Sequence, residues 1–254
     1  MTATPIGRGP AAAPTGHELT IVGFGDIHGQ LEPFASKTDA DGDGVKETVS
    51  AGGISRIAAL IRDIENENPG AVAVVFSGDA LSDIYFHTFG GLDIYGLMSD
   101  AGCEIAAFGN HEFDDGPAAL ASALASAYFE RVCTDLAVEG TPLNDLCAHF
   151  LIKDYGGLSV GYFSLITESL PYVASPGEVV LTGGNLETAR RAVQELRARG
   201  AEIVVAVTHI GLDEDVKLAG AVPGIDVIFG GHSHSYVDAP VRVGDTFVVA
   251  GGER

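Results

Sequence analysis

The sequence predicts an α/β layered domain. Short apolar runs that are rich in β-formers alternate with segments of helical spacing through most of the chain, which is the pattern of strands and helices packed in layers. Hydrophobic residues make up 46% of 254 residues, enough to form a substantial core. No internal repeat interrupts this alternation.

The first half of the chain predicts three strands and three helices. Residues 54, 57, 58, 61 and 64 are apolar, and this spacing predicts a helix over 54–65. A second helix is expected at 92–98. Pro117 suits the first turn of a third, over 118–130. The strands are expected where apolar β-rich runs follow loops, at 19–25, 71–76 and 104–108.

The second half predicts a hairpin, one helix and three more strands. The hairpin lies within 149–166, around the turn residues Gly156 and Gly157. Asn185 is a suitable cap for a helix that runs to Arg199, where Gly200 ends it. The remaining strands are expected at 203–207, 226–229 and 246–249.

Charge excludes two classes of partner. Fourteen basic and 35 acidic residues give a net charge of −21, whereas nucleic acid and anionic membranes both require a basic face. An anionic substrate therefore needs a local positive charge, and a bound metal cation is the obvious source. No apolar stretch has the length of a membrane span.

Residues 1–18 are expected to be a flexible leader. They lack the apolar centre of a signal peptide, so the sequence as given predicts a cytoplasmic protein. The three cysteines are too few, and odd in number, for a disulfide framework. Cys103 lies beside a predicted strand and is expected to be a small core residue.

Five predicted strands each end in a small residue followed by a metal-ligand side chain. In an open α/β sheet the strand ends meet at one crevice, so these side chains should converge. A single such motif is commonly a turn or a hydrogen-bonded core histidine, but five together favour a site. The motifs are GFGDIH (Asp26, His28), VVFSGD (Asp79), AAFGNHE (Asn110, His111, Glu112), VAVTH (His209) and IFGGHSH (His232, His234).

The residue types at these strand ends indicate the kind of metal. Carboxylate, amide and imidazole groups without thiolates suit Mn, Fe or Zn. Seven candidate ligands, with His111 and Glu112 left aside, are too many for one tetrahedral ion and fit two ions that share a carboxylate. Residues two apart in an extended segment point the same way. Asp26 and His28 should therefore reach one ion together, as should His232 and His234 if their turn is extended.

A separate acidic motif resembles a calcium loop. Asp39, Asp41 and Asp43 precede Gly44 in the pattern D-x-D-x-D-G, and Glu47 stands at loop position nine. The twelfth position is Ser50, where an EF-hand has a bidentate Glu. An acidic solvated loop is therefore the favoured interpretation, and calcium binding is the alternative.

The ordered motifs Asp-x-His, Gly-Asp, Gly-Asn-His-Glu, a lone His and Gly-His-x-His resemble those of the calcineurin-like metallophosphoesterases. More narrowly, the segments GDIHGQLEPF, AGGISRIAALI, GNHEFDDG, THIGLDED and GGHSH resemble the N-terminal catalytic domain of the 5′-nucleotidase family, over residues 19–254. The second motif, GDALSD, differs from the GDxVDRG of Ser/Thr protein phosphatases. The resemblance implies a four-layer α/β/β/α sandwich.

The resemblance also implies a role for each motif residue. One metal would be held by Asp26, His28, Asp79 and His234, and the other by Asp79, Asn110, His209 and His232. His111 would be a catalytic residue that faces the substrate without binding metal. Asp114 would support it, and Asn110 would contact the substrate together with His111.

The implied reaction is hydrolysis of a small phosphoester by hydroxide bound at a dinuclear site, without a covalent intermediate. Nucleotide 5′-monophosphates or cyclic nucleotides are the expected substrates. Two alternatives stay open: a hydrolase of another ester, such as a sulfur ester, and a metal-binding module without turnover. Family members carry a C-terminal nucleoside-binding domain, for which this length leaves no room, and many are exported.

Overall fold

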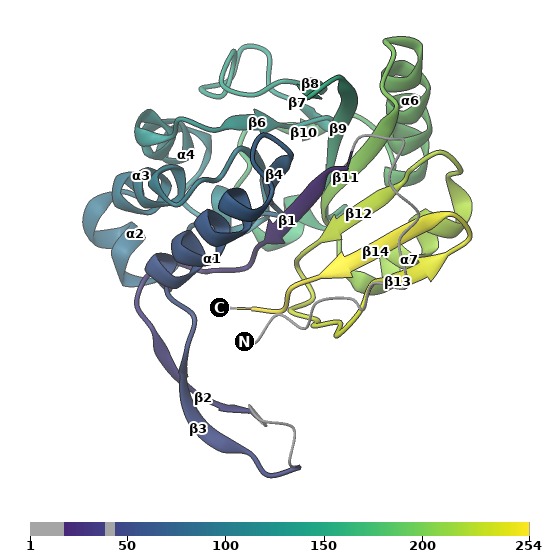
Figure 1. Ribbon diagram of the computed structural model, residues 1–254. Coiled ribbons are helices and arrows are strands. Elements are labelled where there is room, and N and C mark those ends of the chain that lie inside the picture. Colours follow the sequence, from purple (N-terminus) through teal and green to yellow (C-terminus); the bar gives the residue numbers. More distant parts are fainter. Residues whose placement is uncertain (1–17, 39–43, 254) are drawn as a thin grey trace, which may run out of the picture.

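Two β-sheets stacked face to face form the centre of the protein, and helices cover both outer faces (Figure 1). The computed structural model describes residues 18–38 and 44–253, so the expected leader lies almost wholly outside the described residues. The resulting order of layers is helices, sheet, sheet and helices. This α/β/β/α arrangement confirms the predicted fold class.

The first sheet is built by the N-terminal half of the chain, and all its strands run parallel. Its spatial order is β1 (Thr20–Phe24), β4 (Val72–Phe76), β5 (Ile105–Ala107) and β6 (Glu130–Val132). The helical segments of this half are α1 (Ile54–Glu67), α2 (Asp83–Phe89), α3 (Leu92–Asp100), α4 (Pro117–Ala123) and the 3-10 turns η1 (His111–Phe113) and η2 (Leu124–Ser126).

The second sheet is built by the C-terminal half and is mixed, with antiparallel strands at both edges. Its spatial order is β13 (Val241–Val243), β14 (Thr246–Ala250), β12 (Val227–Gly230), β11 (Ile203–His209), β9 (Leu158–Ile166) and β8 (Leu151–Tyr155). The helices of this half are α5 (Leu170–Val173), α6 (Asn185–Ala198) and α7 (Leu212–Ala221).

Strand alternation explains how the layers are held together. On β11, Val204 and Ala206 pack against α6 and α7, whereas Val205 and Val207 face the first sheet. The first sheet uses the same alternation, with Phe76 toward its helices and Val75 toward the second sheet. Three apolar cores therefore lie between four layers, and the two sheets are held in a fixed relation.

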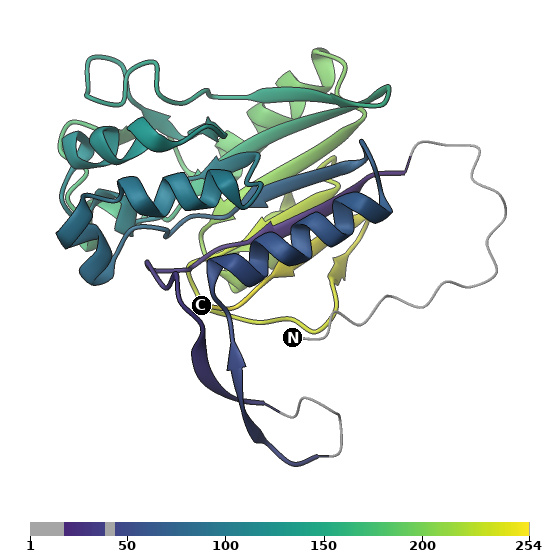
Figure 2. The same cartoon turned by 60° about the vertical axis from the view of Figure 1, so that its left-hand side comes forward.

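Two short antiparallel pairs lie outside the main sheets. They are β2 (Phe34–Thr38) with β3 (Glu47–Ala51), and β7 (Leu136–Ala137) with β10 (Val180–Leu181). The β2–β3 pair forms an arm that extends away from the body of the protein (Figure 2). None of these four strands is predicted by the sequence analysis.

Most predicted elements are found within two or three residues of their expected ends, including the hairpin at Gly156–Gly157. One helix is much shorter than predicted. The segment expected to be helical over 118–130 ends its α-helix at Ala123, and Glu130 begins β6. Its Ala-rich start favours a helix, but Phe129 and Val132 are required in the core beside the parallel sheet. The Asn185 prediction is also off by one residue, because Gly184 occupies the cap position.

The sequence analysis did not foresee that two of the three cysteines pair. Cys133 and Cys147 form a disulfide, with Cα atoms 5.9 Å apart. The count of cysteines carries no information about proximity, which here comes from a bridge between Val132 at the end of β6 and Ala148. Cys103 is free and buried, as predicted. Among the described residues, no helix combines the length and apolarity needed to cross a membrane.

Candidate functional site

The carboxyl ends of β1, β4 and β5 in one sheet meet those of β11 and β12 in the other. His209, the last residue of β11, places Nε2 3.0 Å from Oδ2 of Asp79, which lies just beyond β4. The backbone N–H of His232, beyond β12, donates to Asp26 Oδ1 at 3.0 Å, beyond β1. The structure therefore brings together side chains that are up to about two hundred residues apart in sequence.

Ligand-type side chains at this junction form overlapping groups. We call Asp79, His209 and His232 the buried cluster, and Asp26, His28 and His234 the open cluster; within each, the ligand atoms lie within 4.8 Å of one another. His111 forms a third group with His28 of the open cluster and Asp79 of the buried cluster, and this group links the two clusters. Three protein ligands within reach of one point can hold a metal ion.

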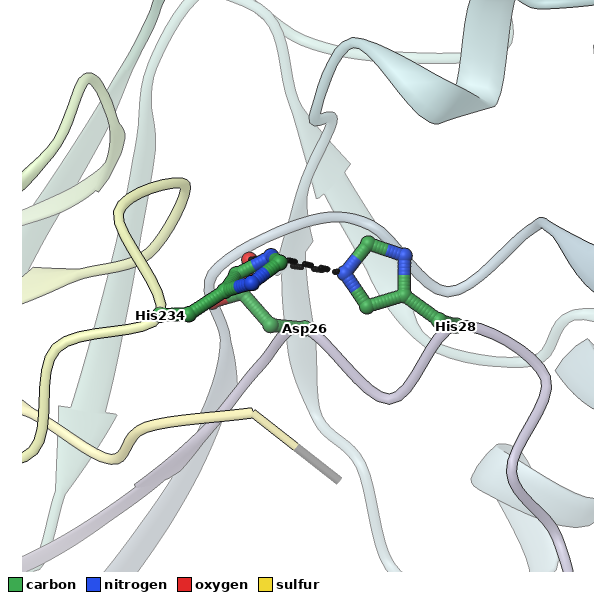
Figure 3. A group of neighbouring side chains, drawn as sticks. All are labelled: Asp26, His28 and His234. Atoms are coloured by element: carbon green, nitrogen blue, oxygen red, sulfur yellow. Dashed lines mark hydrogen bonds and ion pairs between the residues drawn. The ribbon is translucent and has the colours of Figure 1, made fainter.

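The open cluster converges on one point (Figure 3). His28 Nε2 lies 3.0 Å from His234 Nε2, and both imidazoles point toward the carboxylate of Asp26. Asp26 Oδ1 is 4.0 Å from His28 Nε2 and 3.7 Å from His234 Nε2. Two imidazole nitrogens and a carboxylate oxygen arranged in this way form a donor set suited to Mn, Fe or Zn.

Two buried polar atoms at the junction support a metal interpretation. Asn110 Oδ1 has no hydrogen-bond partner among the described residues, and neither has His209 Nε2. His209 Nε2 does approach Asp79 Oδ2, but without the alignment of a hydrogen bond. An unsatisfied buried polar group costs about 1–3 kcal/mol, and a bound cation would satisfy both of these atoms. The residues present therefore fit divalent ions.

The backbone at these positions is unusual. Six described non-glycine residues have positive φ, and five of them belong to the two clusters. Such conformations cost roughly 1–3 kcal/mol each and persist where the surroundings impose them. They are Asp26, His28, Asp79, His232 and His234.

These torsion angles correct the sequence argument about spacing. Asp26 and His28 do converge, but through left-handed turns and not because the segment is extended. His232 and His234 do not converge. His232 belongs to the buried cluster and His234 to the open one, because the turn that carries them is not extended. The two clusters separate His232 from His234, as does the division between two metals that the family resemblance implies.

Asp79 lies at the centre of the junction. Its carboxylate contacts His209 through Oδ2 and accepts a hydrogen bond from the backbone N–H of His111 through Oδ1, at 2.9 Å. Burial opposes its charge, but the attraction of His209 and the hydrogen bond from the His111 N–H outweigh burial and lower the pKa of Asp79. A Cβ on Gly109 would collide with this carboxylate, so only glycine fits there. Asp79 is therefore held ionised between both clusters.

His111 and Asp114 form a pair at the edge of the junction. His111 Nδ1 lies 2.6 Å from Asp114 Oδ2, and about two fifths of each side chain is exposed. Burial opposes the charge on the imidazole, but the hydrogen bond to Asp114 and the nearby carboxylates raise the pKa of His111. The ring stands edge-on to His28, with centroids 5.2 Å apart. An imidazole held in this way can donate a proton to a group bound at the clusters.

Glu112 has a structural role that the sequence analysis did not foresee. Its buried carboxylate accepts hydrogen bonds of 2.6 to 3.0 Å from four backbone N–H groups, those of Asp79, Ala80, Leu81 and Gly109. Both oxygens are occupied, so Glu112 does not serve the clusters as a ligand. It fastens the loop after β4 to the loop after β5. The sequence signal that could have pointed to this role is the position of Glu112 within the Gly-Asn-His-Glu motif.

The calcium interpretation concerns another part of the molecule. Asp39, Asp41 and Asp43 lie outside the described residues. The residues on either side belong to β2 and β3, whereas an EF-hand loop lies between two helices. The flanking structure therefore differs from that of an EF-hand.

Comparison with known proteins agrees with this geometry. The family model described as calcineurin-like phosphoesterase matches residues 19–236, so the chain belongs to that family. Membership of this family implies that the protein binds divalent metal ions, and the two clusters are candidate sites for them.

Among its relatives, the chain is 28% identical over 225 residues to snake venom 5′-nucleotidase of Gloydius brevicauda, covering 87% of this chain and 37% of that protein. The crystal structure of a 5′-nucleotidase precursor from Thermus thermophilus superposes with a TM-score of 0.84 at 30% identity, over 92% of this chain and 49% of that one. The sulfate thiohydrolase SoxB of Thermus thermophilus shares the fold, with a TM-score of 0.75 at 22% identity over 96% of this chain and 53% of that one. The chain thus spans less than half the length of these nucleotidases.

Proposed function

We propose that this chain hydrolyses small phosphoesters, with nucleotide 5′-monophosphates or cyclic nucleotides as substrates. The observation that supports it most is the pair of metal-ligand clusters joined by Asp79, with His111 beside both. The named 5′-nucleotidases among its relatives support the nucleotide class. Such hydrolysis belongs to nucleotide breakdown.

In this proposal two divalent ions occupy the clusters. Asp26, His28, Asp79 and His234 hold one, and Asp79, Asn110, His209 and His232 hold the other. The donor set favours Mn, Zn or Fe. When bound, such ions neutralise phosphate charge and lower the pKa of a bound water to about 7.

Calcium at Asp39, Asp41 and Asp43 is a lesser proposal, and Asp41→Asn with calcium analysis tests it.

The chain's own residues perform two tasks. Asn110 and His111 contact the phosphoester, and Asp79 fixes the distance between the clusters. His111 donates a proton to the leaving oxygen, because its pKa is raised and its Nδ1 is held by Asp114, which leaves Nε2 free to face the substrate. Asp114 orients the ring and stabilises its charge.

The test is hydrolysis by the metal-reconstituted chain of a nitrophenyl phosphate, a panel of nucleotides and a sulfur ester. We expect chelator-sensitive release of phosphate. Metal binding without release of any product would support the non-catalytic module, and release only from the sulfur ester would support that alternative. SoxB, at 22% identity, bears on fold alone and gives no support to the sulfur ester.

Recognition of the nucleobase is expected to be weak in residues 19–254 alone. The family resemblance assigns nucleoside binding to a second domain and metal binding to the part that this chain resembles. We therefore expect less than roughly a hundredfold selectivity among bases, equivalent to about 2.7 kcal/mol. Greater selectivity would show that these residues contact the base themselves.

The disulfide bears on the compartment. Disulfides persist in oxidising compartments and are rare in the cytosol. Cys133–Cys147 therefore favours an oxidising compartment over the cytoplasm expected from the sequence as given. The protein is isolated under conditions that prevent thiol–disulfide exchange and is then denatured. Thiol labelling before reduction should modify Cys103 alone. Labelling of all three cysteines would favour the cytoplasm.

A further inference from the structure

His234 is bound on its far side by a residue outside every motif described above. Its Nε2 faces Asp26 and His28, while its Nδ1 lies 2.8 Å from Oε2 of Glu253. Both side chains are about two fifths exposed. The imidazole therefore spans the distance between the open cluster and a carboxylate.

Backbone pairing places Glu253 at this position. Tyr236 and Gly251 form an antiparallel bridge. On either side of it, Val237 N donates to Ala250 O at 3.1 Å, and Gly252 N donates to Ser235 O at 2.9 Å. In an antiparallel ladder each step along one strand is a step back along the other, so residue 253 comes opposite residue 234. The contact is thus fixed by register, although both side chains are partly exposed.

The arrangement has a chemical consequence. A neutral imidazole that binds metal through Nε2 carries its proton on Nδ1, and a carboxylate that accepts a hydrogen bond from this N–H fixes the tautomer, orients the ring and strengthens the ligand. His209 in the buried cluster has a hydrogen bond of this kind to a backbone partner, because its Nδ1 lies 2.8 Å from Ser77 O. His234 Nδ1 and Glu253 Oε2 are equally close, at 2.8 Å, but they form a charged contact that lacks the alignment of a hydrogen bond. Each cluster therefore has one histidine whose distal nitrogen lies against an oxygen.

We propose that Glu253 is a positioning residue that holds His234 with Nε2 directed at the metal of the open cluster. This rests on the proposed function, since it requires His234 to be a ligand. Glu253 acts through His234 and contacts neither metal nor substrate.

Zinc binding to the full chain tests this, measured by competition with a chromophoric chelator. Glu253→Ala should weaken one of two binding steps about 10–100-fold and leave the other unchanged. Glu253→Gln, which keeps an acceptor but lacks the charge, should fall between Glu253→Ala and the wild type. The matched control is Asp245→Ala in the turn of the β13–β14 hairpin, where the side chain is fully exposed. It removes an equal charge and should change neither step.

A double variant separates positioning from direct binding. In a His234→Ala background, Glu253→Ala should have no further effect on zinc affinity; a further loss of equal size would overturn the inference. A cobalt-substituted sample gives an independent readout. One slowly exchanging, strongly shifted proton resonance, that of His234 Nδ1–H, should disappear in Glu253→Ala.

The two proposals fail differently. If His234→Ala leaves both zinc-binding steps unchanged, His234 is not a ligand and the proposed metal assignment is wrong. If His234→Ala weakens one step while Glu253→Ala weakens neither, the metal assignment stands and only the role of Glu253 is refuted.

Discussion

The buried and open clusters use the same residue types on different supports. His209 ends β11, is fully buried, and has its Nδ1 held by Ser77 from the other sheet. His234 lies in the connection between β12 and β13, is about two fifths exposed, and is held by Glu253. A side chain on a central strand needs only a backbone carbonyl to orient it, whereas one in a loop depends on a second side chain. The open cluster should therefore be the weaker and more adjustable site.

The largest effect is expected from a substitution that disrupts both clusters together. Asp79 lies between them, so Asp79→Ala should lose both ions. It should also lower turnover about 10⁴-fold or more, because losing the ions removes several kcal/mol of charge stabilisation. Elemental analysis and phosphate release on the same samples provide the measurement. Asp26→Ala is the matched control and should keep the ion of the buried cluster; loss of equal metal from both variants would contradict a bridging role for Asp79.

A smaller effect is expected at the residue that touches both clusters without belonging to either. His111→Asn should keep both ions and lower turnover about 10²–10⁴-fold, the usual contribution of a general acid. The loss should be smaller for a nitrophenyl phosphate than for an alkyl phosphate, because a good leaving group needs little protonation. Asp114→Asn should behave as a milder version, since it removes only the orienting partner. An equal loss on both substrates, or loss of metal, would show that His111 has another role.

Metal release should separate the clusters directly. In a chelator the ion of the open cluster should leave first, with the two phases about tenfold apart or more, because its supporting partner is an exposed side chain. His234→Asn should abolish the fast phase and His209→Asn the slow one. Time-resolved chelator absorbance measures both. Release in a single phase from the wild type would mean that the two supports do not differ in strength.

The smallest expected effect is a change in the pH dependence of stability, and it concerns a buried acid beside the buried cluster. Asp215 is fully buried, accepts a hydrogen bond from Thr208 at 2.6 Å, and has a second oxygen without a partner among the described residues. Burial raises its pKa from 3.8 to about 7. The folded state therefore retains a proton that the unfolded chain releases.

From this it follows that the contribution of Asp215 to the free energy of unfolding should fall as pH rises from about 4 to about 7, by at most about 1.4 kcal/mol per pH unit, and then level off. Asp215→Asn, which does not titrate, should flatten this slope. Urea unfolding at several pH values measures it. The exposed Asp213→Asn is the control. Burial also raises the pKa of Asp135 to about 7, so part of the slope should remain, and a slope in Asp215→Asn equal to that of the wild type would contradict the assignment.

The convergence of ligands was predictable because local patterns determine it. Parallel strands can be recognised from apolar runs, and parallel strands bring their carboxyl ends to one edge. Asp26, Asp79 and His209 therefore reach the same place whatever the details of the loops. The family motifs supplied the division between clusters.

Features that depend on the register of distant segments could not be predicted. Glu253 meets His234 only because residues 250–252 pair with 235–237. Likewise, Cys133 and Cys147 meet through a bridge after β6. The separation of His232 from His234 depends on left-handed backbone, so the alternating pattern did not indicate it and only the family motifs implied it. Each of these requires tertiary structure, which the local sequence does not specify.

The order of the sheets along the chain has a consequence for assembly. Every strand of the first sheet precedes residue 133, and every strand of the second follows residue 150, yet each proposed ion takes ligands from both. The ions would act as removable cross-links between two successive halves of the polypeptide. Because a ligand that binds only the assembled form stabilises it by mass action, fragments divided just before β8 should reassociate more tightly as metal is added. The protein is thus a natural candidate for metal-controlled fragment complementation.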